Sequence, residues 1–197
     1  MILRFHYLTD SQISRWKAWV TFLTLEVPEE DADTIPEVAI YPTLLHSLQD
    51  NTKTERVVNE KTAEDFYKKN VWAYAILIEG ETLKNGRKIN LCINRINGDS
   101  RNIPIEFNFL HEIGHFNIMR RRLPQKIYFP KDEEEADMYG LIQYLKILKK
   151  YPAYTTISTQ PKAIEMENRF KEYLDVFQEK SVEEIAERLA KEIGWRK

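Results

Sequence analysis

The 197-residue chain has one cysteine, Cys92, and only six glycines and four histidines. A single cysteine excludes a disulfide within the chain, which favours a reducing compartment such as the cytoplasm. Cys92 lies in an apolar stretch, where a small buried side chain is more common than a nucleophile. We therefore expect a cytoplasmic protein in which this cysteine has a packing role.

Long apolar runs and a strong net charge are also missing. The longest apolar run, residues 71–78, is far too short to cross a bilayer. The first residues lack a basic start followed by an unbroken apolar stretch, so we expect no export signal. A formal net charge of −2 provides no chain-wide positive field for nucleic acid. The one dense basic cluster, Arg120 to Arg122 with Lys126, is expected to be a solvated helix end. Neither a membrane span nor direct nucleic-acid binding is expected.

Hydrophobic residues make up 43% of the chain and aromatic residues 12%, which is enough for a packed core. Apolar residues recur at helical spacing in five segments, so we expect five main helices. The first should be capped by Asp10 or Ser11 and end before Pro28. The last should begin at a capping box formed by Ser181 and Glu184. Of the other three, one follows Pro104, one begins at Asp132, and one has an apolar stripe of Ile164, Phe170, Leu174 and Phe177.

Two further segments have the alternating pattern of strands. Residues 71–78 and 88–94 predict a hairpin or short meander with a turn at Asn85 and Gly86. The acidic segment from Pro28 to Pro36 predicts an exposed loop, and Pro42 is expected to open a short helix. The fold class is therefore α+β and mostly helical, with a small antiparallel sheet packed on the helix after Pro104. The expected organisation is a helical extension (1–60), a core (61–150) and C-terminal helices (151–197).

The helix expected after Pro104 contains the pattern H-E-x-x-H at His111, Glu112 and His115. Histidines four residues apart project from one helix face, so both imidazoles can bind one zinc ion at about 2.0–2.1 Å. Glu112 is rotated by about 100° from His111 and comes to lie beside the metal. There its carboxylate can accept a proton from a water molecule. The alternative is a half-buried helix with two structural histidines.

An acidic run at the start of the next expected helix offers a third ligand. Glu133 and Asp137 are four residues apart and share a helix face, so one can bind the metal while the other receives an imidazole N–H. We favour Glu133 as the ligand. Glu134 and Glu135 are expected to complement the helix dipole and remain the alternatives if the register differs.

The segments FLHEIGHF and EEEADMYG together resemble the gluzincin pattern, and most closely the ImmA/IrrE family of metallopeptidases. The resemblance covers about residues 71–148. It implies that His111, His115 and Glu133 bind zinc, that Glu112 is the general base, and that Asp137 orients a ligand histidine. The short gap between His115 and Glu133 departs from the family pattern, and residues 1–60 match nothing in it.

The resemblance implies a zinc-dependent endopeptidase that cleaves an intracellular regulatory protein, such as a helix-turn-helix repressor or an antitoxin. An oxyanion donor would also be needed, and Tyr128, Tyr139 and Tyr154 are candidates. One alternative is a regulatory binding module that keeps zinc for stability and does not cleave its partner. Another is a zinc hydrolase that acts on a non-peptide bond.

Overall fold

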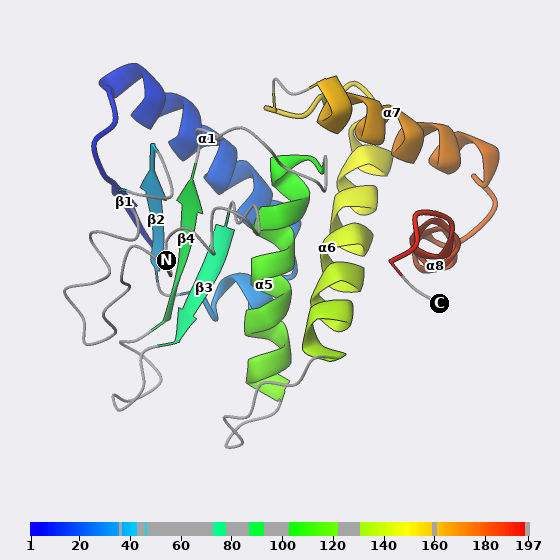
Figure 1. Cartoon of the computed structure of the whole chain (residues 1–197), viewed down its shortest axis with the longest axis horizontal. Helices are drawn as coiled ribbons and strands as arrows, with labels where there is room; N and C mark the ends of the chain where they lie inside the picture. Colours follow the sequence, from blue (N-terminus) through cyan, green and yellow to red (C-terminus); the bar gives the residue numbers. More distant parts are fainter. Residues whose placement is uncertain are drawn as a thin grey trace. The chain divides into compact units, whose positions relative to one another are not determined.

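The computed structural model describes residues 1–35, 37–42, 46, 73–77, 87–92, 103–121, 131–158 and 161–195 (Figure 1). Two compact units form, one from Met1–Phe22 with Ile35–Arg101 and the other from Leu23–Thr34 with Asn102–Lys197. These units group residues by their proximity in space. The domain boundaries expected near residues 60 and 150 stay a prediction. The helix expected after Pro42, apart from His46, and the turn at Asn85 and Gly86 lie outside the described residues, as does Tyr128.

The first unit contains a four-stranded mixed sheet in the order β1-β2-β4-β3. Its strands are β1 (Ile2–Phe5), β2 (Glu37–Tyr41), β3 (Ala73–Leu77) and β4 (Arg87–Cys92). β1 pairs with β2 and β2 with β4 in parallel, whereas β3 and β4 are antiparallel. The α+β class and the pairing of the two predicted strands are confirmed. The prediction of a purely antiparallel sheet is wrong, because two unforeseen strands join in parallel to segments distant in sequence, which hairpin spacing does not reveal.

Helix α1 (Asp10–Glu26) is present as the apolar spacing predicts. Its cap is Thr9, one residue earlier than expected. The Thr9 Oγ1 accepts from the Gln12 backbone N–H at 3.4 Å, and the Gln12 side chain accepts from the Thr9 N–H at 3.0 Å. This reciprocal pair is a capping box with glutamine in the third helical position.

The segment after Pro28 is not the exposed loop that its composition predicts. It forms a one-turn helix, α2 (Glu29–Ala32), in which Asp31 is only 1% exposed. Ile35 is also buried. Asp31 is retained in the interior because donors from two other helices satisfy its carboxylate, as described below.

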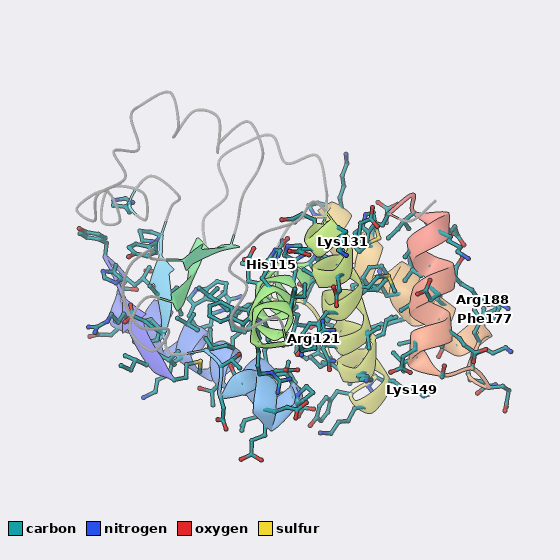
Figure 2. All side chains as sticks on the ribbon, turned by 90° about the horizontal axis from the view of Figure 1, so that it is seen from below. His115, Arg121, Lys131, Lys149, Phe177 and Arg188 are labelled. Atoms are coloured by element: carbon teal, nitrogen blue, oxygen red, sulfur yellow. The ribbon has the colours of Figure 1, made fainter. Side chains whose placement is uncertain are left out.

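The second unit is helical. It contains α5 (Ile105–Arg121), α6 (Lys131–Lys150), α7 (Pro161–Val176) and α8 (Val182–Glu192). α5 and α6 lie side by side, and α6 also packs against α7 and α8 (Figures 1 and 2). The expected capping box at Ser181 and Glu184 is confirmed. None of the helices in the described part of the chain has the length and apolar character needed to span a membrane.

The apolar stripe of α5 is buried as predicted. Phe107, Leu110 and Ile118 are each at most 3% exposed. On α7 the expected stripe is only partly correct, because Ile164 is 42% exposed while Phe170 is fully buried. Burial of this stripe determines how α5 is rotated about its own axis. The directions of its polar side chains at positions 111, 112 and 115 follow from that rotation.

Candidate metal centre

Helix α5 brings the two histidines of the motif together. The Nε2 atoms of His111 and His115 lie 3.0 Å apart, with the rings almost perpendicular. His111 is only 8% exposed. Without a metal the two rings can share one N–H as a hydrogen bond, and when both Nε2 atoms are deprotonated their lone pairs can bind a cation. The arrangement suits a shared cation.

Helix α6 adds Glu133 to this pair. Its Oε2 lies 3.4 Å from His111 Nε2, and its Oε1 lies 3.5 Å from His115 Nε2. Ligand atoms bound to one tetrahedral zinc at about 2.0–2.1 Å are about 3.3–3.4 Å apart. The three side chains therefore fit a zinc ion both in donor chemistry and in spacing.

The neighbouring glutamates lie elsewhere. Glu134 is exposed, and the carboxylate of Glu135 pairs with Arg121 near the end of α5. Figure 2 shows Arg121 and His115 on α5, and Lys131 at the first residue of α6. Within the acidic run, the Glu133 carboxylate lies beside both imidazoles, and its role as the metal ligand stays a prediction.

Asp137 lies one helical turn after Glu133, behind His111. Its Oδ1 forms an ion pair at 2.8 Å with His111 Nδ1, the ring nitrogen that faces away from His115, although the two atoms do not meet at hydrogen-bonding angles. A carboxylate at this position favours the tautomer with a proton on Nδ1, which leaves the Nε2 lone pair for a metal. The sequence spacing allowed this position for either residue of the pair, and the orienting role of Asp137 stays a prediction.

The protein groups alone give the two histidines opposite pKa shifts. Burial disfavours charge on His111, but the carboxylates of Asp137 and Glu133 and the negative charge of Glu112 outweigh it and raise its pKa to about 10. Burial and the positive charge of His111 lower the pKa of His115 to about 4. Three acidic residues thus surround one cationic and one neutral imidazole, which leaves an excess of negative charge for a cation.

Glu112 is buried on the same helix, with 8% of its surface exposed. Glu112 interacts with other residues of the protein. Its negative charge raises the pKa of His111. Its position next to a ligand histidine is consistent with the role of general base.

Two of the candidate oxyanion donors are already engaged. The Tyr139 hydroxyl donates to Asp31 Oδ2 at 2.8 Å, and the Tyr154 hydroxyl donates to Glu106 Oε1 at 3.0 Å. Burial and Asp31 raise the pKa of Tyr139 well above its usual value, so this hydroxyl stays protonated. As they are oriented, neither points its proton toward a substrate.

The basic cluster at the end of α5 is paired with carboxylates where it can be described. Arg120 lies 2.9 Å from Asp31 and 3.4 Å from Glu30, and Arg121 pairs with Glu135. Arg122 and Lys126 lie outside the described residues. The ion pairs reduce the positive field expected from this cluster, which weakens the case for a nucleic-acid site.

No protein-family model, curated protein or solved structure matches the chain. The argument for the site therefore rests on its own geometry.

Sequence reasoning did not foresee the burial of two carboxylates in the helical unit, Asp31 and Glu106. Asp31 and Glu106 are at most 1% exposed, and hydrogen-bond donors from other segments satisfy both. Asp31 belongs to an acidic segment of ordinary solvent-facing composition. Glu106 lies in the first turn of α5, where an acidic residue is usual for dipole reasons. No sequence pattern distinguishes either of them from an exposed residue.

Proposed function

We propose that this chain is a zinc-dependent metallopeptidase with His111, His115 and Glu133 as its metal ligands and Glu112 as its general base. The observation that carries the proposal is the convergence of three ligand atoms from two helices, with Asp137 placed behind His111. Structural zinc sites usually have four protein ligands, often including cysteine, whereas three ligands leave a position open for water or substrate.

The chain's own residues have separate tasks in this proposal. Asp137 holds the ring of His111 through Nδ1, and so directs Nε2 toward the metal position. A bound zinc would supply Lewis acidity toward a peptide carbonyl and toward water. Glu112 accepts a proton from the water whose oxygen adds to the peptide carbonyl carbon, and it delivers that proton to the amine as the C–N bond breaks. No other described group is assigned a proton-transfer role.

The substrate class follows from the sequence resemblance. The ImmA/IrrE pattern favours limited cleavage of an intracellular regulatory protein, such as a helix-turn-helix repressor or an antitoxin. The hydroxyls of Tyr139 and Tyr154 donate to Asp31 and Glu106. Stabilisation of the oxyanion is therefore assigned to another group or to the metal itself.

The first experiment measures metal and activity in the same preparations. The purified chain is analysed by elemental mass spectrometry, and then incubated with casein and with helix-turn-helix regulators encoded beside it. Fragments are mapped by mass spectrometry. We expect about one zinc per chain and cleavage of one regulator at few positions. Glu112→Gln should keep the zinc and lose cleavage, because the amide cannot accept the proton.

Glu134→Gln is the matched control, since it makes the same chemical change at an exposed position of α6. It should retain zinc and activity. Full cleavage by Glu112→Gln would remove the general base from the proposal. Regulation of the partner without cleavage, unchanged in Glu112→Gln, would support the zinc-stabilised binding module instead.

A further inference from the structure

Two residues that the proposed chemistry does not use lie against His111, and a third packs on one of them. The first is Gly140 on α6, which faces the α5 backbone. A methyl group added at Gly140 would lie 3.0 Å from His111 N and 3.2 Å from its Cα. Contacts this short require the neighbour to move by a few tenths of an ångström. Because the neighbour is main chain, the backbone of His111 itself would have to move.

The second residue is Phe107, one turn before His111 on α5. Its ring centroid lies 6.2 Å from that of His111. Its Cε2 atom would lie 3.3 Å from the added methyl at Gly140. Phe107 is 1% exposed, so it has little freedom to turn away.

The third residue is Trp195, whose ring packs on Phe107 with centroids 4.7 Å apart. The end of α8 places it there. Gly194 has φ +76°, its N–H donates to Lys191 O at 3.2 Å, and the Trp195 N–H donates to Ala190 O at 2.8 Å. These two bonds define a Schellman motif, which turns the chain sharply after the helix.

We propose that Gly140, Phe107 and Trp195 form a packing cluster that holds His111 in position to bind the metal. In this proposal Trp195 is a positioning residue of the metal centre. The inference rests on the metal site of the proposed function. Asp137 orients the His111 ring, whereas this packing cluster determines the position of the His111 backbone. Metal–ligand distances in a plausible site lie within about 0.2 Å of their standard values. A shift of a few tenths of an ångström at His111 is larger than that range.

The test uses cobalt(II) as a spectroscopic probe and zinc in a chelator competition, on the full chain. Trp195→Ala should weaken zinc binding by about three- to tenfold, and Gly140→Ala by about 10- to 100-fold, the range for residues that support metal ligands. Both should change the visible absorption of bound cobalt. Trp195→Phe keeps a ring against Phe107 and should restore the spectrum and affinity.

Two control variants separate positioning from general loss of stability. Phe177→Ala removes a partly buried ring that contacts Arg188, where α7 and α8 meet (Figure 2). Leu148→Ala opens a cavity on α6 at a position 2% exposed. Both should lower the melting temperature and leave the cobalt spectrum and zinc affinity unchanged.

The outcomes distinguish this inference from the proposed function. If the wild-type chain binds neither zinc nor cobalt, the proposed function fails. If the wild type binds both and Trp195→Ala retains its affinity and spectrum, the positioning role of Trp195 fails while the metal site stands. Trp195 is close to the end of the described chain, so its alanine variant should fold even if Gly140→Ala does not.

Discussion

Two polar clusters lie between α5 and α6, and they have opposite balances of donors and acceptors. In one, the buried carboxylate of Asp31 accepts from Asn117 at 2.6 Å, Arg120 at 2.9 Å and Tyr139 at 2.8 Å. In the other, the Nε2 atoms of His111 and His115 converge with the carboxylate of Glu133.

The Asp31 cluster contains its own cation and three donors, so it satisfies its carboxylate without a ligand. The histidine cluster gathers acceptors and negative charge at one place, with carboxylates on two sides of His111. The comparison teaches that burial of polar groups does not identify a functional site. The excess of acceptor atoms and negative charge at the histidine cluster is what supports the proposed metal site there.

The largest expected effect is loss of metal from the histidine cluster. His111→Ala, His115→Ala and Glu133→Ala should each abolish stoichiometric zinc, because each removes one of three protein ligands. Elemental analysis after dialysis measures this. His46→Ala, a histidine whose ring contacts Tyr7 outside the cluster, is the control and should keep the metal. Full zinc in Glu133→Ala, with loss in Glu135→Ala, would show that the register of the acidic run is wrong.

The next effect concerns the Asp31 cluster and should appear in stability. Asp31→Ala leaves the Arg120 guanidinium without its closest carboxylate and removes the acceptor for Tyr139. Breaking a buried ion pair on one side typically costs about 3–5 kcal/mol. Urea unfolding should show a loss of that order, while the folded fraction still binds zinc. Glu30→Ala is the exposed control and should change stability by less than about 1 kcal/mol. If Asp31→Ala loses zinc at full stability, the two clusters are not independent.

A smaller effect is expected at Asp137. Asp137→Asn should weaken zinc affinity by about 10- to 100-fold, because the amide holds the His111 tautomer less firmly than the carboxylate. Competition with a chromogenic chelator measures the change. Glu134→Gln offers a comparison on the same helix, because it removes one negative charge at an exposed residue. An affinity loss as large in Glu134→Gln would mean that charge matters more than orientation.

Much of the second unit could be predicted from sequence, because its signals are local. Helical spacing and the capping box at Ser181 determine where α8 begins, and the four-residue spacings of His111 with His115 and of Glu133 with Asp137 place their side chains on shared faces. The proximity of these two faces to one another follows from the packing of α5 on α6. No local pattern contains that information.

The sheet and the Asp31 cluster were unpredictable for the same reason. β1 and β2 pair in parallel although 35 positions separate Ile2 from Glu37, and neither has a turn beside it to signal a partner. Asp31 is buried by contacts with residues 86 and 108 positions away. Such pairings depend on tertiary structure, so composition alone assigned this segment to the surface.

The smallest expected effect, at Tyr139, tests the boundary between the two clusters. Tyr139 lies two residues after Asp137, yet its hydroxyl donates to Asp31. Tyr139→Phe removes one of three donors and leaves Asn117 and Arg120 in place, so we expect a loss of about 1 kcal/mol in urea unfolding. Zinc affinity and the rate of substrate cleavage should stay at wild-type values. Tyr144→Phe is the matched control, because it removes a buried hydroxyl that donates to Glu167 on α7. A large fall in kcat for Tyr139→Phe, with stability unchanged, would mean that this hydroxyl leaves Asp31 to stabilise the oxyanion during the reaction.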